Sequence, residues 1–197
     1  MKWVKQSIHY WCPDTKEQKF LGQNVTVAIL DTGISPHPDF KDRILSFRDF
    51  SSTTGSSEKV LFSFSHFSPL IDNSGHGTHV AGILAGSGLL SSGTYAGIAP
   101  FCNLIIGKVL DQNGNGSIKN VINGIQWIRD IYTQFHIRII NISVGTRPDL
   151  SIHQKLLLLN AVESLWDLGL VVVVSAGNYG PAPGSVTVPG SSPKVIT

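Results

Sequence analysis

Four short runs of apolar residues along the chain predict the strands of a sheet. They are rich in aliphatic and β-branched side chains and have the length of strands, and the first ends in an Asp-Thr-Gly turn. The last contains four consecutive valines, which predicts a strand buried on both faces, as in a parallel sheet. The predicted strands are Val25–Leu30, Asn103–Leu110, Ile137–Val144 and Leu170–Ser175.

Segments with helical periodicity lie between these strands. Isoleucine and valine recur every three or four residues over Ile118–Ile131, which predicts a helix. Gly77–Gly86 and Ile152–Leu168 are two further candidates, the latter with Ser151 as its N-cap and Gly169 as its left-handed stop. Strands that alternate with helices indicate an α/β fold whose mostly parallel sheet is flanked by helices on both faces.

The composition is that of a globular protein, with 42% hydrophobic and 14% charged residues among 197. A chain of this length buries one substantial core, so we expect a single domain over residues 25–197, after an N-terminal segment of residues 1–24. A net charge of +2, with no basic cluster, argues against a nucleic-acid partner.

Neither end of the chain indicates export or membrane attachment. Residues 1–24 contain no continuous apolar stretch and no small-residue cleavage site, so we expect a cytoplasmic protein. The apolar run near the end of the chain is far too short to span a bilayer, so no membrane partner is expected. The two cysteines, Cys12 and Cys102, cannot form a disulfide framework and are expected to be reduced thiols. The stretch SSTTGSS at residues 51–57 is predicted to be a polar surface loop.

Polar residues follow three of the predicted strands at the point where each strand ends. Asp31 follows the first strand, Ser143–Thr146 ends the third, and Ser175–Asn178 ends the fourth. Ligands bind beyond the carboxyl ends of the strands in open parallel sheets. We therefore expect these residues to meet at one edge of the sheet.

The stretch NSGHGTHVAGILAG at residues 73–86 holds two histidines, His76 and His79, near the start of a predicted helix. A carboxylate such as Asp31, at the end of a buried strand, needs a hydrogen-bonded partner. It can fix the tautomer of His76 and leave the second ring nitrogen free as a base. Asn178 at the fourth strand exit can donate its amide to an oxyanion. Taken singly, these residues are more often turn or core residues. A metal pair of the two histidines is the weaker alternative, because the helical zinc signature has a four-residue spacing and a Glu.

With these motifs the chain resembles the subtilisin-like serine proteases (subtilases). The resemblance covers residues 25–197 in the family's order, through VAILDTGISPHPDF, NSGHGTHVAGILAG, GIAPFCNLIIGKVLDQNGNGS, IINISVG, VVVSAGNYGP and VPGSSPKVIT. It implies a three-layer subtilisin-like fold, incomplete at its C-terminus, and a serine endopeptidase with an Asp-His-Ser triad. By this resemblance Asp31 orients the imidazole, His76 is the general base, Asn178 supplies an oxyanion-hole amide, and His79 is structural.

The resemblance also implies a peptide or protein substrate that adds in extended form to backbone segments at the edge of the sheet. Asp72, four residues before His76, matches an acidic residue on the rim of the cleft, with a plain loop residue as the alternative. The implied substrate-binding residues are Gly114, Asn115 and Gly116, then Ser143, Val144 and Gly145, and Ser175, Ala176 and Gly177 beside the pocket for the residue before the cut.

No cofactor is expected to be required, and calcium is the one candidate for a structural ion. Asp39 matches a position that binds calcium in many members of the family. The segment SGLLSSGTYAG at residues 87–97 lacks the oxygen-rich pattern that would complete such a site. DQNGNG at residues 111–116 lacks the bidentate Glu of a calcium loop and is interpreted as part of the cleft.

The nucleophile of the family lies in a Gly-Thr-Ser-Met-Ala motif, which these 197 residues do not contain. Ser143 and Ser185 lie in other contexts. We therefore interpret the chain as the N-terminal part of a protease, inert alone, whose serine lies in a missing part or on a second chain. The alternatives are a non-catalytic peptide-binding pseudoprotease or remnant and, less favoured, a metal-dependent hydrolase that uses Asp31 and His76.

Overall fold

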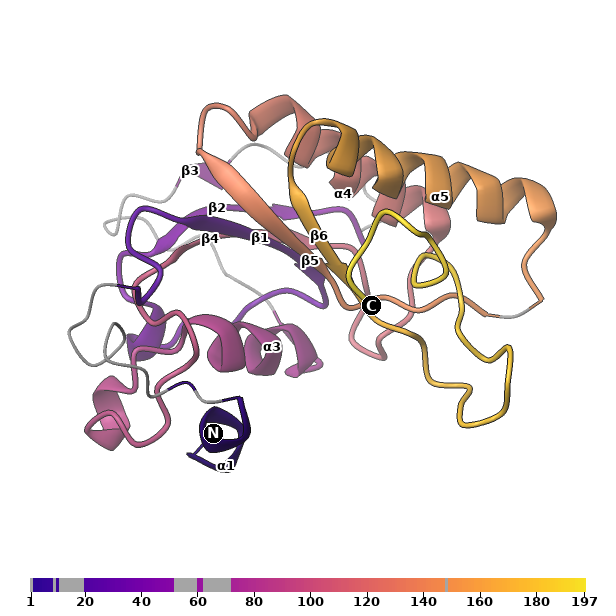
Figure 1. Ribbon diagram of the computed structural model, residues 1–197. Coiled ribbons are helices and arrows are strands. Elements are labelled where there is room, and N and C mark those ends of the chain that lie inside the picture. Colours follow the sequence, from indigo (N-terminus) through magenta and orange to yellow (C-terminus); the bar gives the residue numbers. More distant parts are fainter. Residues whose placement is uncertain (1, 9, 11–19, 52–59, 62–71, 148) are drawn as a thin grey trace.

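A six-stranded sheet with helices on both faces forms the centre of the molecule (Figure 1). The computed structural model describes residues 2–8, 10, 20–51, 60–61, 72–147 and 149–197. Cys12 and nearly all of the predicted loop at residues 51–57 lie outside these residues. The predicted α/β fold with a mostly parallel sheet is confirmed.

The strand order in the sheet is β3-β2-β4-β1-β5-β6, and every neighbouring pair is parallel except β2 with β3. Four of the strands match the predicted ones: β1 has the predicted length but is shifted by one residue, and β4, β5 and β6 are each two residues shorter than predicted. Strands β2 and β3 were not predicted. The strands are β1 (Thr26–Asp31), β2 (Ile44–Asp49), β3 (Val60–Leu61), β4 (Asn103–Lys108), β5 (Ile137–Ile142) and β6 (Val171–Val174).

The central strand β1 contributes side chains to both layers of the core, because successive residues of a strand point to opposite faces of the sheet. Ala28 and Leu30 belong to one buried cluster, and Val27 and Ile29 belong to the other. All four are at most 2% exposed. The strand that ends in Asp31 is thus held rigidly from both sides, which fixes the position of that carboxylate.

The two layers are completed by α4 (Ile118–Ile131) and α5 (Ile152–Asp167) on one face and by α3 (His76–Ala85) on the other (Figure 1). The predicted signals around α5 are confirmed. Ser151 forms a capping box with Gln154, and Gly169 after the helix has a φ of 82°. No helix in the described part of the chain has the length and apolar character needed to cross a membrane.

Within the described ranges, three shorter helical segments lie outside these layers. They are α1 (Lys2–Ser7) and the 3-10 helices η1 (Pro38–Phe40) and η2 (Leu89–Ser91). Figure 1 shows α1 next to the N-terminal label, apart from the sheet.

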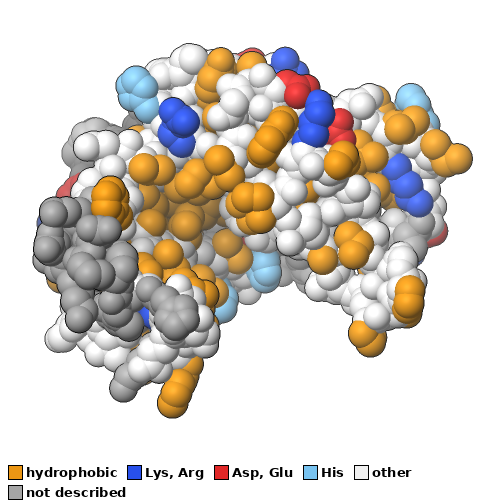
Figure 2. Space-filling view, viewed as in Figure 1, with side chains coloured by type: hydrophobic (Ala, Val, Ile, Leu, Met, Phe, Trp, Pro, Cys, Tyr) orange, Lys and Arg blue, Asp and Glu red, His pale blue; other side chains and the backbone are white. Residues whose placement is uncertain are grey.

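The prediction that the valine-rich strand is buried on both faces is wrong. Val172 and Val174 of β6 pack in the core beneath α5, but Val171 is 39% exposed and Val173 is only partly buried. Val171 pairs with Ile139 of β5, so their side chains share the face that α3 covers only in part. Figure 2 shows hydrophobic side chains gathered in a hollow on this side of the molecule.

Candidate active site

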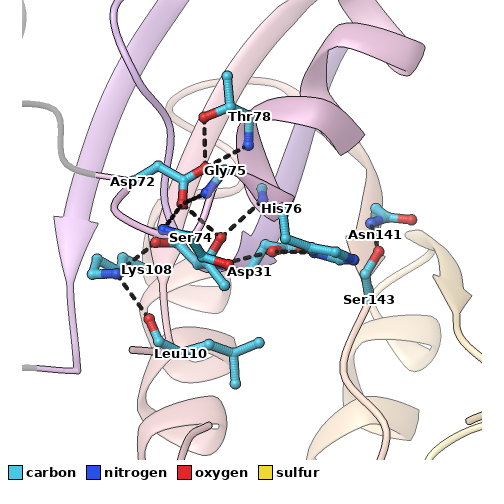
Figure 3. Close-up of polar contacts among 12 residues, drawn as sticks. Asp31, Asp72, Ser74, Gly75, His76, Thr78, Lys108, Leu110, Asn141 and Ser143 are labelled. Carbon is cyan, nitrogen blue, oxygen red and sulfur yellow. Dashed lines mark hydrogen bonds and ion pairs between the residues drawn. The ribbon is translucent and has the colours of Figure 1, made fainter. Parts of the chain in front are cut away.

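Asp31 and His76 form a hydrogen-bonded pair at the carboxyl edge of the sheet (Figure 3). The His76 Nδ1 atom lies 2.7 Å from the Asp31 Oδ1 atom. The Asp31 side chain is completely buried, whereas the His76 side chain is 53% exposed. The sequence prediction that these two residues meet agrees with this geometry, which buries the carboxylate and leaves the far side of the ring accessible.

This arrangement suits a proton acceptor. The carboxylate accepts the Nδ1–H of a neutral imidazole and leaves the Nε2 lone pair on the exposed side of the ring. When Nε2 takes up a proton, the positive charge of the imidazolium lies beside a buried negative charge. The Asp31 Oδ2 atom is buried and has no hydrogen-bond partner among the described residues. The hydrogen bond from the His76 ring is therefore important for stabilising the negative charge of the buried carboxylate.

The start of α3 is fastened directly to the loop that follows β1. The backbone N–H of Gly77 donates to Thr32 Oγ1 at 2.8 Å, and the Thr32 N–H donates to Asp31 Oδ1 at 2.7 Å. Gly77 lies so close to the Gly33 backbone that no larger residue fits without movement. The His-Gly dipeptide therefore places the ring of His76 against Asp31 through a close backbone contact.

Asp72 is a buried residue that organises the loop before α3, a role that neither of its two sequence interpretations included. It is 9% exposed and accepts hydrogen bonds from the hydroxyl groups of Thr32 and Thr78 and from the backbone N–H groups of Ser74, Gly75 and Thr78 (Figure 3). Burial opposes the charge, but these hydrogen bonds outweigh it and lower the pKa of Asp72. Since α3 has no acidic residue in its own first turn, this carboxylate supplies the negative charge that a helix N-terminus favours.

Lys108 is a buried cation at the same edge that sequence reasoning missed. It is 6% exposed and ends β4 directly beside Asp31 in the parallel register. Its Nζ atom donates to the carbonyl oxygen of Thr32 at 2.6 Å and to that of Leu110 at 2.9 Å. A lysine at the end of an otherwise apolar strand was the available signal. Its bonds hold the backbone next to Asp31 in place.

The structure brings together two of the predicted substrate-binding segments. A Cβ atom on Gly145 would lie 3.2 Å from the Gly177 Cα atom, so residues 143–145 and 175–177 are in contact. The side chain of Val144 is buried in the core, which leaves only its backbone for an extended peptide. Asn178 lies just beyond them and is exposed, and no hydrogen bond joins it to His76 in the described part of the chain.

Thr187 is a second residue that sequence reasoning missed. Its Oγ1 atom is buried, has no partner within the described ranges, and would lie 2.4 Å from a Cβ atom on Gly177. The Thr187 N–H donates to the carbonyl oxygen of Ala176 at 3.0 Å. No sequence signal identifies it, because it meets the 143–145 and 175–177 segments only in the folded chain.

The third predicted segment, Gly114–Gly116, lies in an exposed loop after β4 that Asp111 organises. The Asp111 Oδ1 atom accepts the backbone N–H groups of Asn113 at 2.8 Å and Asn115 at 2.9 Å. The hydrogen bonds of this carboxylate are thus made within its own loop and give residues 111–116 a defined shape.

The candidate calcium residue Asp39 lies in η1, at the far end of α3 from His76. Its Oδ2 atom accepts the Gly88 N–H at 2.9 Å, and its Oδ1 atom is buried 3.8 Å from His37 Nδ1, without a hydrogen-bond partner among the described residues. Calcium requires about six to eight oxygen ligands. One carboxylate oxygen without a hydrogen bond does not meet that need, so the donors described here do not fit the ion. No group of three or more His, Cys, Asp or Glu side chains within the described ranges is arranged to hold a metal.

Comparisons with known proteins agree with this geometry. The family model described as the subtilase family matches residues 22–197. Serine protease AprX of Bacillus subtilis (strain 168) is 42% identical over 185 residues, which cover 91% of this chain and 39% of that protein. The major intracellular serine protease of the same organism is 37% identical over 161 residues, which cover 81% of this chain and 44% of that protein.

Solved structures give the same result for the fold. Sphericase superposes with a TM-score of 0.73 at 30% identity, over 89% of this chain and 53% of that one. The S41 psychrophilic protease superposes with a TM-score of 0.69 at 33% identity, over 86% of this chain and 50% of that one. The chain thus spans about half of these structures, and less than half of the two relatives above.

Proposed function

Since the chain belongs to the subtilase family, we propose that it carries the acid–base part of a serine endopeptidase active site, with Asp31 and His76 as two members of the triad. One observation carries this proposal: a fully buried carboxylate lies 2.7 Å from Nδ1 of a half-exposed imidazole. A merely structural pair would have no need to leave the second ring nitrogen facing solvent.

The chemistry follows from that geometry. His76 Nε2 takes the proton of a serine hydroxyl as its oxygen attacks the carbonyl carbon of the scissile peptide bond. The imidazolium then gives the proton to the leaving amine, and the peptide C–N bond breaks to leave an acyl-enzyme. Water, activated by the same nitrogen, hydrolyses the ester and restores the serine.

Asn178 is proposed as the side chain that donates to the oxyanion of the tetrahedral intermediate. It follows β6, two strands away from β1, at the same edge of the sheet as Asp31. An extended peptide substrate would pair with the backbone of residues 114–116 and 143–145. Residues 143–145 and 175–177 are in contact, which supports the proposal that together they line the pocket for the substrate residue before the cut.

The nucleophile is proposed to be a serine outside these 197 residues, either on a longer polypeptide or on a second chain. The sequence has no Gly-Thr-Ser-Met-Ala motif. Among the described residues, no serine hydroxyl lies within hydrogen-bond distance of the His76 ring, whose partner is Asp31. The 197-residue chain by itself is therefore expected to be inert.

Labelling with a fluorophosphonate probe tests this function. The full-length protein here means the complete protein that contains these 197 residues together with the part proposed to carry the serine. This protein and its His76→Ala variant would be purified, treated with the probe and analysed by denaturing intact mass. We expect one adduct on the wild-type protein and none on the variant, because an unassisted serine hydroxyl is a poor nucleophile. His153→Ala is the matched control, since His153 is exposed on α5, on the other face of the sheet.

The outcomes separate catalysis at this site from peptide binding alone. An adduct that survives His76→Ala would show that His76 is not the base. A wild-type protein that takes no label but binds extended peptides would indicate the non-catalytic alternative.

A further inference from the structure

Arg43 joins three segments at the end of α3 that lies away from His76. Its Nη1 atom donates to the carbonyl oxygen of Cys102 at 2.9 Å, just before β4. Its Nη2 atom donates to the carbonyl oxygen of Ala85 at 2.7 Å and to that of Asp39. The guanidinium thus links the last residue of α3, the 3-10 helix η1 and the start of a central strand.

The end of α3 has an electrostatic need that Arg43 meets. The C-terminus of a helix carries a partial negative charge, and α3 has no basic residue in its own last turn. The carbonyl oxygens of Ile83 and Leu84 accept the backbone N–H groups of Ile98 and Ala99. The carbonyl oxygen of Ala85 is bonded by the guanidinium instead. Arg43 therefore satisfies the helix end with both a donor and a full positive charge.

Arg43 also occupies the oxygens that a metal ion in this corner would need. The carbonyl oxygens of Asp39, Ala85 and Cys102 are its acceptors, and Asp39 Oδ2 is already bonded to the Gly88 N–H. The neighbouring segment at residues 87–97 contains no carboxylate or side-chain amide. A divalent ion bound to these carbonyl oxygens would also be repelled by the positive charge of the Arg43 guanidinium, which is in hydrogen-bond contact with them.

We propose that the guanidinium of Arg43 is the structural cation at the end of α3, near the position where the family resemblance would place calcium. It holds α3, η1 and β4 together without a metal ion at Asp39. Burial lowers the pKa of Arg43 while the carboxylate of Asp39 opposes that shift. Arginine nevertheless stays protonated in proteins, so the charge is permanent. The inference concerns stability and does not depend on the proposed catalytic function.

Thermal unfolding of the purified full-length protein, in excess calcium chloride and in excess EDTA, tests this. Any effect of calcium on the melting temperature is expected to be the same in wild type and in Asp39→Asn. Arg43→Gln is expected to melt about 5 °C or more below wild type in both buffers, because it leaves buried carbonyl oxygens unpaired. Arg129→Gln is the matched control: Arg129 also lies in the last turn of a helix but is exposed, so its loss should change the melting temperature by about 1 °C or less.

Two results would overturn the proposal. One is a calcium-dependent rise in the wild-type melting temperature that Asp39→Asn removes, which would place a metal ion at that carboxylate. The other is an Arg43→Gln variant with the same melting temperature as Arg129→Gln, which would show that the guanidinium does not stabilise the contacts between these segments.

Discussion

Gly77 and Gly33 approach each other so closely that a Cβ atom on Gly77 would lie 2.3 Å from the Gly33 carbonyl oxygen. Real Cβ atoms do not come this near to backbone, so any side chain at position 77 must push α3 away from the loop after β1. The histidine that precedes Gly77 moves with the helix. The contact between two glycines therefore sets the distance between His76 and Asp31.

Gly77→Ala is expected to damage both stability and activity. Forcing a methyl group into this contact costs about 1–3 kcal/mol, and a shift of about 1 Å at the base lowers kcat/KM about 100-fold. Peptide hydrolysis and thermal unfolding of the full-length protein would measure the two effects. Ser74→Ala, at an exposed side chain just before α3, is the control and should change neither. Full activity in Gly77→Ala would show that the helix has room to move.

Asp31→Asn is expected to lower kcat about 10⁴-fold while the protein stays folded. An amide of the same size can donate to Nδ1 and so stabilise the wrong tautomer of His76, with the proton on Nε2. Steady-state kinetics with circular dichroism as a check of the fold would measure this. Asp130→Asn, at an exposed aspartate on α4, serves as the control. A loss no greater than in the control would remove Asp31 from the proposed triad.

Asp72 makes the free energy of unfolding depend on pH in the acid range. Its hydrogen bonds hold its pKa below the ordinary value of 3.8 in the folded chain. Asp72 therefore contributes stability in full above that ordinary value, and the contribution is lost as pH falls through the lower folded pKa. We expect Asp72→Asn to cost about 1–3 kcal/mol at pH 7 and the difference from wild type to shrink below about pH 4. Denaturant unfolding at several pH values checks this; a pH-independent difference would contradict it.

Thr187→Ala is expected to change the preference for the residue before the cut. Removing the hydroxyl and methyl groups opens space beside Gly177, between the two segments proposed to line that pocket. The ratio of kcat/KM for a substrate with Phe to one with Ala at that position should rise about tenfold. Ser185→Ala, nearby in the sequence but outside that contact, is the control. An unchanged ratio would separate Thr187 from the substrate pocket.

Sequence patterns located the elements whose signals are local. The apolar run before Asp31, the isoleucine spacing of α4, and the Ser151 cap and Gly169 stop of α5 each depend on a few neighbouring residues, and all are found in the structure. The pairing of Asp31 with His76 was predictable because a carboxylate at the end of a buried strand needs a hydrogen-bonded partner, and the histidine begins a helix at that edge of the sheet.

Features that depend on distant contacts were missed or misread. The sequence of β2, ILSFRD, has no clear period, and its register against β4 shifts between Ile44 and Ser46. Its strand character comes from that pairing. The family resemblance matched Asp72 to a residue on the rim of the cleft, with a plain loop residue as the alternative. In the structure its carboxylate oxygens bind a helix start and a hydroxyl from another loop. Neither interaction leaves a signal in the local pattern.

The order of the strands has a consequence during synthesis of the chain. Strand β1 is made early, yet it lies between β4 and β5, and its Thr26 pairs with Asn103, which is 103 − 26 = 77 residues later. Strand β2, made soon afterwards, also has to wait for β4. At about 5–20 residues per second, the ribosome takes about 4–15 seconds to supply that partner. Throughout this interval an apolar strand on the nascent chain has no sheet to join, which makes it a natural binding site for chaperones.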